Sequence, residues 1–374
     1  MIAVYEENLK ENTLLAICIC TYKRAHLLEK LLLDIFNQTC LPGFLIIIDG
    51  DPESGAVARM LAILNFPQSC QVIYLPSNHG NLSYQRYLGW KVASQMKSDF
   101  LLYFDDDLRI FQKDSVDKTI APLLWNKNIV GVTGNTCTGD ISKHANSEAL
   151  VDRAKLGGPS SLVRLFGAAR TLPPGSLSPS GHRSAPRDQG NDYEPVEWLQ
   201  GRTMAYKMAA LTEACFSEDL FALDHIRCGL GEDTFLSRRV GTRGKLLMAF
   251  CAHFEHPDDD LPKCYPYQAF KFGYATAYSR RLLNDYYRGF DPPEFSDRVA
   301  LIKSYLGTSL LNWWRAVSAP RRHRFAYAWG YTLGACRGMM QKPTAKNLTP
   351  QIDWRQDAKE ALKNLQVLQE GKSA

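Results

Sequence analysis

The sequence predicts an α/β fold with a mostly parallel, Rossmann-like sheet flanked by helices and followed by a helical C-terminal extension. Short apolar runs alternate with segments of helical periodicity through the first third of the chain. The first run, Leu14–Cys20, is continuous in the way that is typical of a strand buried on both faces. Polar residues follow three of the predicted strands, and ligands of such sheets bind beyond the carboxyl ends of the strands.

The remaining elements follow the same alternation. Periodicity predicts helices at Leu27–Ile35, Ala56–Leu64 and Ser83–Lys97, and strands at Phe44–Ile48, Gln71–Leu75 and Phe100–Phe104. Further along the chain, we expect a long loop in the Pro/Gly/Ser-rich stretch 172–190, ordered structure again at Val196–Leu199, a helix near Ala205–Ala214, mostly helices beyond Phe270 and a polar-faced last helix at Asp353–Glu370.

Composition places the chain among ordinary folded proteins. Its 374 residues suit one large domain plus an appendage, and 45% of them are hydrophobic and 22% charged. A net charge of +5 does not by itself suggest nucleic acid. Ten cysteines show no CxxC pair or zinc spacing, so we interpret them as reduced thiols of a cytosolic protein. The acidic start, with Glu6, Glu7 and Glu11, is unlike a signal peptide.

Three adjacent carboxylates, Asp105, Asp106 and Asp107, follow the strand predicted at Phe100–Phe104. Such a group is electrostatically unfavourable unless a cation lies among its members. Mg²⁺ and Mn²⁺ take oxygen ligands and often bind through carboxylates together with substrate phosphates. A solvated acidic turn is the alternative for a single Asp-x-Asp. The other strand ends that converge on this edge favour a divalent metal site.

Several motifs resemble those of family 2 inverting glycosyltransferases. The opening strand and turn of that family are similar to Ile17–Arg24, and the match extends over about residues 14 to 260. The other matching motifs, in the family's order, are Asn37–Thr39, Asp49–Asp51, Asn78–Asn81 with Gln85 and Arg86, Asp105–Asp107, Trp198–Met204 and Gly231–Ser237. The resemblance implies a GT-A fold and a nucleotide-sugar donor.

On the donor side, the resemblance implies that Thr21 and Tyr22 line the base pocket and that Asp49 holds the base or ribose. The turn here reads Asp-Gly-Asp, so Asp51 stays open as an alternative to Asp49. Arg86 would contact the nucleotide or steady the aspartates.

The resemblance implies that Asp105 and Asp106 face the ribose and the metal and that Asp107 is the principal metal ligand. His256 would complete the metal shell as a neutral nitrogen ligand. A solvent-exposed or supporting histidine remains the alternative, and His253 could compete for the role.

The resemblance also places the catalytic base. An inverting transfer needs a group that accepts the proton of the attacking hydroxyl, and the resemblance assigns this role to Asp233, with Glu232 as its positioning partner. The alternative is a pair of acids in the first turn of a helix, which the helix dipole favours. Trp198, Gly201 and Arg202 would lie on the acceptor side, although a tight turn explains Gly201 almost as well.

These assignments predict a catalytic domain at 1–265, divided into a nucleotide-binding half (14–135) and an acceptor-side half (136–265), and a helical region at 266–374. The expected reaction transfers a sugar from a nucleoside diphosphate to a hydroxyl of a saccharide or lipid-linked acceptor, as in polysaccharide biosynthesis. A nucleotidyltransferase acting on a sugar phosphate would need a Gly-rich phosphate loop after the first strand, which is absent. A non-catalytic nucleotide-sugar-binding relative should have lost Asp107 or Asp233.

The C-terminal region is basic and aromatic. Trp313-Trp314-Arg315 and the cluster Arg321–Arg324 before Phe325 and Trp329 suit a helix on an anionic membrane surface. A helical cap with packed aromatic residues is the alternative. No recognition module accompanies the basic residues, so we expect no nucleic-acid partner. The predicted location is the cytoplasm, with the inner face of the membrane as the site of a peripheral attachment.

Overall fold

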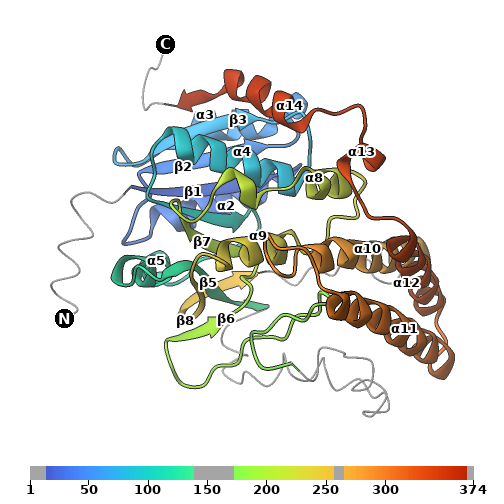
Figure 1. Ribbon diagram of the computed structural model, residues 1–374. Coiled ribbons are helices and arrows are strands. Elements are labelled where there is room, and N and C mark those ends of the chain that lie inside the picture. Colours follow the sequence, from blue (N-terminus) through green and yellow to red (C-terminus); the bar gives the residue numbers. More distant parts are fainter. Residues whose placement is uncertain (1–13, 139–171, 257–264, 369–374) are drawn as a thin grey trace.

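The computed structural model describes residues 14–138, 172–256 and 265–368. The described residues form one nine-stranded sheet in the order β6-β8-β5-β7-β4-β1-β2-β3-β9. Helices cover both faces of the sheet, and three long C-terminal helices pack together beside it (Figure 1). The predicted α/β class, with a mostly parallel sheet, flanking helices and a helical C-terminal region, is confirmed.

Strand β1 (Leu15–Thr21) lies in the parallel half of the sheet. It pairs with β2 (Phe44–Asp49) and β4 (Phe100–Asp105), and β3 (Gln71–Pro76) extends the parallel set beyond β2. All seven residues of β1 are buried, as its continuous apolar sequence predicts. The register aligns Thr21 with Asp49 and Cys20 with Asp105, so the polar strand ends meet at one edge.

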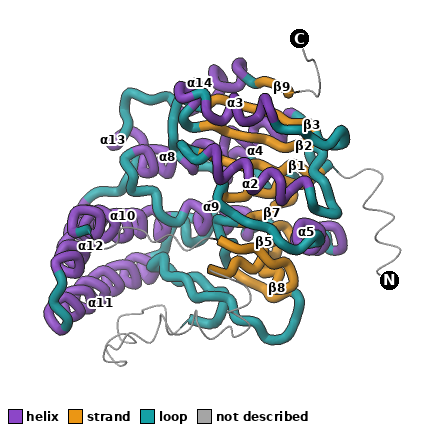
Figure 2. Tube along the Cα trace, turned by 180° about the vertical axis from the view of Figure 1, so that it is seen from behind, coloured by secondary structure: helices purple, strands orange, loops and turns teal. Residues whose placement is uncertain are grey.

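Helices connect the parallel strands on the two faces of this sheet (Figure 2). Their bounds agree with the predicted helices to within two residues, and one helix, α5, was not predicted. The four helices are α2 (Ala25–Phe36), α3 (Ala56–Ile63), α4 (Leu82–Gln95) and α5 (Ser115–Trp125). Helix α4 is buried along most of its length, and Asn81 caps its N-terminus by accepting a hydrogen bond from the Tyr84 amide at 3.0 Å.

The second half of the sheet contains parallel and antiparallel pairs. Its elements are β5 (Ile129–Thr138), β6 (Tyr193–Val196), β7 (Thr203–Lys207), α8 (Glu218–His225), α9 (Glu232–Gly241) and β8 (Lys245–His256). The helix predicted near Ala205–Ala214 is wrong. Residues 203–207 form a strand that lies antiparallel between β4 and β5, because pairing on both sides overrides the local helical pattern. In the 172–190 stretch, the described residues contain only one isolated bridge, between Leu177 and Arg183.

The C-terminal region is helical, as predicted beyond Phe270. It contains α10 (Pro266–Asp285), α11 (Phe295–Ser318), α12 (Arg322–Met340), α13 (Ala345–Leu348) and α14 (Trp354–Ala361). The single helix predicted at Asp353–Glu370 needs correction, because α14 ends at Ala361 and residues 366–368 form β9, antiparallel to β3. The end of that predicted helix, and the acidic start of the chain, lie outside the described residues.

Candidate functional site

The three aspartates lie where β4 ends and the chain turns. The Leu108 amide donates to the carbonyl of Asp105 at 3.2 Å, which closes the turn. Asp106 and Asp107 are buried, whereas Asp105 is partly exposed. Carboxylates in such a place need nearby positive charge or hydrogen-bond donors.

Asp105, Asp107 and His256 form a cluster that can hold a metal ion. One ligand atom from each of the three residues lies within 4.8 Å of the other two. Asp107 Oδ1 is buried and lies 3.1 Å from Nε2 of His256. A buried carboxylate oxygen beside an imidazole nitrogen is suited to a cation. The two carboxylates and one imidazole fit Mn²⁺ or Mg²⁺, with Mn²⁺ accepting the nitrogen more readily.

The third aspartate is held by protein groups. The Thr21 hydroxyl donates to Asp106 Oδ2 at 2.7 Å, and Arg24 lies 3.3 Å from Asp106 Oδ1. Arg24 also donates to Asp107 Oδ2 at 2.8 Å. Burial raises the pKa of Asp106 to about 6 although Thr21 and Arg24 oppose the shift. Burial also acts against ionisation of Asp107, but His256 and Arg24 outweigh it and lower the pKa of that carboxyl.

Arg86, on α4, joins the aspartates to the second carboxylate centre. Its Nη2 atom donates to Asp105 Oδ1 at 3.1 Å and to the carbonyl of Gly201 at 2.8 Å, and its Nη1 atom donates to Glu232 Oε1 at 2.8 Å. The side chain is only 4% exposed. These contacts place the guanidinium of Arg86 between Asp105 and Glu232.

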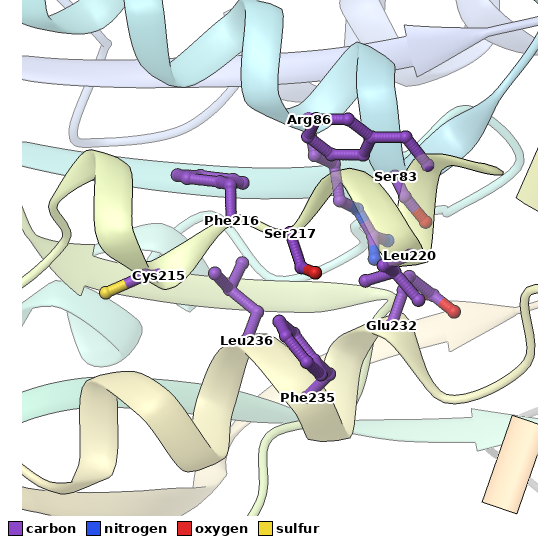
Figure 3. Close-up of a pocket in the computed structure, with 10 residues that line it drawn as sticks. Ser83, Arg86, Cys215, Phe216, Ser217, Leu220, Glu232, Phe235 and Leu236 are labelled. Carbon is purple, nitrogen blue, oxygen red and sulfur yellow. The ribbon is translucent and has the colours of Figure 1, made fainter. Parts of the chain in front are cut away.

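The Arg86–Glu232 pair borders a small, largely apolar pocket between α4, α8 and α9. Figure 3 shows the two side chains reaching toward each other from α4 and α9. Other residues around this pocket include Ser83, Cys215, Phe216, Ser217, Leu220, Phe235 and Leu236. Burial and the neighbouring charge of Asp233 raise the pKa of Glu232, and Arg86 acts in the opposite direction.

Asp233 is fixed in the first turn of α9. Its Oδ1 atom accepts a hydrogen bond from the Thr234 amide at 2.7 Å. Its Oδ2 atom accepts bonds from Arg183 Nη1 at 2.7 Å and from the Gly201 amide at 3.2 Å. Burial opposes the charge of Asp233, but Arg183 and the Thr234 amide outweigh it, so the pKa of this carboxyl is lowered. The contacts around Asp233 therefore favour its anionic form.

Arg183 comes from the 172–190 loop and stacks on an aromatic residue. Its guanidinium carbon lies 4.7 Å from the ring centroid of Trp198, which is buried and donates through Nε1 to the Ser184 carbonyl at 3.2 Å. The preceding residue, His182, lies 2.7 Å from the Ser304 hydroxyl on α11. The loop thus connects Asp233 to the C-terminal helices.

Tyr22 lines a second cavity, which is larger than the pocket beside Arg86 and Glu232. This cavity lies next to the end of β1 and the turn between β3 and α4. The Tyr22 side chain is exposed, and its ring lies so close to Gly80 that a Cβ atom there would be 2.5 Å away. The cavity has a volume of about 370 Å³, large enough for a small ligand. Its wall consists of Tyr22, Asn78, His79, Gly80, Asn81, Asp224, His225, Arg227, Gly229 and Leu230.

Two residues expected at the nucleotide are buried and are not among the residues that line this cavity. Asp49 is 0% exposed and accepts hydrogen bonds from the Tyr74 hydroxyl and the Asp51 amide, both at 2.9 Å. Thr21 is buried and orients Asp106. Asp51, the open alternative, is partly exposed.

The structure adds residues that the sequence analysis did not single out. Arg24 has a weak sequence signal, a basic residue just after a strand end, but its contact with Asp107 depends on the fold. Arg183 has no periodic signal because it lies in an irregular loop. Arg202, by contrast, was expected on the acceptor side and is partly exposed. Burial raises the pKa of Asp105, and the charges of Arg86 and Arg202 act against this shift. Burial and Arg202 act to lower the pKa of His256, but the contact with Asp107 outweighs them and raises it.

Comparison with known proteins gives one family and several distant structures. The sequence profile described as glycosyl transferase family 2 matches residues 16–173. No curated protein sequence matches the chain significantly.

The similar solved structures share little sequence with this chain. A mannosyltransferase from Pyrobaculum calidifontis in complex with GDP-Man and Mn²⁺ is 12% identical, with 92% of this chain and 89% of that chain covered and a TM-score of 0.46. TarS 1–349 from S. aureus is 12% identical, with 88% and 92% covered and a TM-score of 0.39. At these scores the similarity does not extend to ligands or reactions.

Proposed function

We propose that this protein is a glycosyltransferase of the GT-A class and that it inverts the configuration at the anomeric carbon of the sugar it transfers. The match of residues 16–173 to the glycosyl transferase family 2 profile supports this proposal. The donor is a nucleoside-diphosphate sugar, and the acceptor is a hydroxyl of a saccharide or of a lipid-linked molecule. The observation that carries this proposal is the position of Arg86, which donates hydrogen bonds both to Asp105 of the metal-ligand cluster and to Glu232 of the Glu232–Asp233 pair. The two groups of carboxylates therefore belong to one site.

We assign the part of the site that binds the donor to the carboxyl ends of the parallel strands. Asp105, Asp107 and His256 would hold Mn²⁺ or Mg²⁺. When bound, such an ion neutralises negative charge that develops on a departing diphosphate. Tyr22 forms a wall of the neighbouring cavity, where an aromatic ring can stack on a nucleoside base.

The acceptor end is assigned to Asp233. The acceptor oxygen attacks the anomeric carbon and the bond from that carbon to the diphosphate oxygen breaks. The acceptor proton passes to the Asp233 carboxylate, and the diphosphate leaves with the bonding electrons. Arg183, Thr234 and Gly201 hold this carboxylate in its anionic form, while Arg86 positions Glu232 beside it.

Two alternatives have less support. A nucleotidyltransferase needs a glycine-rich phosphate loop after the first strand, and residues 21–24 contain no glycine. A binding protein without activity would not need both carboxylate centres. If the acceptor is lipid-linked, the enzyme would work in the cytoplasm at the inner face of a membrane.

The first prediction concerns Asp233→Asn. We expect this change to lower sugar transfer about 10²- to 10⁴-fold, because a positioned general base contributes about that much. Release of nucleoside diphosphate from a panel of nucleotide sugars, with Mn²⁺ and candidate acceptors, measures the effect. Nucleotide binding should persist in the variant.

The matched control is Asp291→Asn, an exposed carboxylate outside the site. It should retain the wild-type rate. Activity of Asp233→Asn within a few-fold of wild type would remove Asp233 from the role of base.

A further inference from the structure

Helix α11 exposes a row of large apolar side chains along one side. The row recurs every three or four residues, which is the spacing of one helix face. Leu310 is 62% exposed and Trp314 is 57% exposed. The full row consists of Ile302, Leu306, Leu310, Trp314 and Val317. Single exposed apolar residues are ordinary, but a continuous row indicates a surface that meets a partner.

Helix α12 carries a second row, on the side that does not pack on α10. Gly330 and Gly334 face α10 so closely that a Cβ atom would lie 2.1 Å from the Phe270 carbonyl oxygen and 2.4 Å from that of Tyr274. The exposed row consists of Phe325, Trp329, Leu333 and Met340. The glycines therefore fix α12 with this row outward, and Trp329 is 52% exposed.

Trp313 joins the two rows into one face. Its ring centroid lies 6.4 Å from that of Phe325 and 6.1 Å from that of Trp329. Its indole nitrogen donates to the Thr332 hydroxyl at 3.1 Å. Helices α11 and α12 also lie side by side at the outer end of the molecule (Figure 1). We call the two rows together with Trp313 the α11–α12 face.

Beyond the first turn of α11, the sequence of α11 and α12 contains only positive charges. From Arg298 to Lys346 there are nine Lys or Arg residues and no Asp or Glu, and of these nine Arg298 and Lys342 form ion pairs with Asp285. Lys303 is exposed next to Ile302, and Arg321 and Arg322 are exposed where α12 begins, one turn before Phe325. Apolar and tryptophan side chains with a basic border are the combination that binds the interface of anionic lipids.

We propose that the α11–α12 face docks this protein on an anionic membrane surface, with the tryptophans and aliphatic residues among the acyl chains and the basic residues at the headgroups. None of the helices in the described ranges is long and apolar enough to cross a bilayer. A second copy of the chain is a poorer occupant, because a symmetric pairing would bring the same basic residues together. The proposal extends beyond the transfer reaction and does not depend on it.

Vesicle sedimentation of the full chain tests this inference. The probes are vesicles of phosphatidylcholine alone and vesicles containing about a third phosphatidylglycerol. Wild type should sediment with the anionic vesicles, and rising salt should weaken the binding. The triple variant Leu310→Ser, Trp314→Ser, Trp329→Ser should bind at least tenfold more weakly, because it removes three large side chains from the face. Exposed substitutions leave folding intact, which circular dichroism verifies.

The matched control is Leu33→Ser with Ile63→Ser, which removes exposed apolar side chains of α2 and α3. This variant should bind vesicles as wild type does. Three results would overturn the inference: no sedimentation of wild type, equal losses in the triple variant and the control, or a dimer in light scattering that the triple variant alone dissociates. The third result would assign the face to contacts between copies.

Discussion

At the scale of single residues, the Asp233 carboxylate shows how an irregular loop can tune a site. Arg183 donates a hydrogen bond to Oδ2 and places a positive charge beside it, and the Arg183 guanidinium packs on the ring of Trp198 in a cation–π contact. The charges of Glu232 and Arg86 also interact with this carboxylate. The motif Gly231–Ser237 points to Asp233 from sequence alone, but no sequence pattern points to Arg183, since its position depends on how the loop packs.

Replacement of Arg183 should change the pH dependence of transfer. In wild type the pKa of Asp233 is lowered, so the base stays ionised as pH falls. Arg183→Gln removes the positive charge and lets that pKa rise, which moves the acidic limb of kcat/KM toward higher pH. Arg183→Lys should restore most of the profile.

The control for this prediction is Arg187→Gln, which changes an exposed arginine of the same loop. Its profile should match that of wild type. An unmoved acidic limb in Arg183→Gln would contradict the role given to Arg183, whatever happens to the maximal rate.

At the scale of elements, the sequence predicts secondary structure well for strands that are buried on both faces. It predicts poorly the short strands whose conformation depends on pairing with neighbouring strands. The apolar runs of β1 to β4 have few alternatives to a buried strand. β7 has five residues and takes its form from β4 and β5. β9 has three residues and depends on the free edge of β3. Such short strands have no strong pattern of their own, so local periodicity misassigned both segments.

The tail that contains α14 has a structural role. Trp354 is fully buried, with its ring 5.1 Å from that of His79, 5.2 Å from Tyr84 and 5.9 Å from Phe221. Asp357 on the same helix accepts a hydrogen bond from the Tyr84 hydroxyl. Because His79 lines the larger cavity, α14 supports one wall of the proposed nucleotide site.

Trp354→Ala should lower the free energy of unfolding by about 3–5 kcal/mol, the usual result of truncating a buried tryptophan. Denaturant unfolding measures this change. Trp314→Ala, at an exposed position of α11, should change stability by less than about 0.5 kcal/mol. Equal effects of the two substitutions would contradict the packing role of α14.

At the scale of the whole molecule, the parallel strands bring distant segments to one edge of the sheet. The convergence of the strand ends near Asp105 was predictable, because parallel strands end on the same side. The approach of His256 to Asp107 needed the pairing of β8 with β5, more than 100 residues apart in sequence. The internal burial of Asp49 was not predictable, since it depends on the Tyr74 hydroxyl of the neighbouring strand.

The central claim is that Asp105, Asp107 and His256 bind a divalent cation that holds a nucleoside diphosphate. The most direct measurement is the melting temperature of wild type and of Asp107→Asn with nucleoside diphosphates, with and without Mn²⁺. A ligand that binds only the folded state at about 100 times its Kd adds about 2.7 kcal/mol. Wild type should therefore gain several degrees with the preferred nucleotide and Mn²⁺ together, and Asp107→Asn should gain little. Equal gains in both proteins, or a full gain without Mn²⁺, would contradict the account.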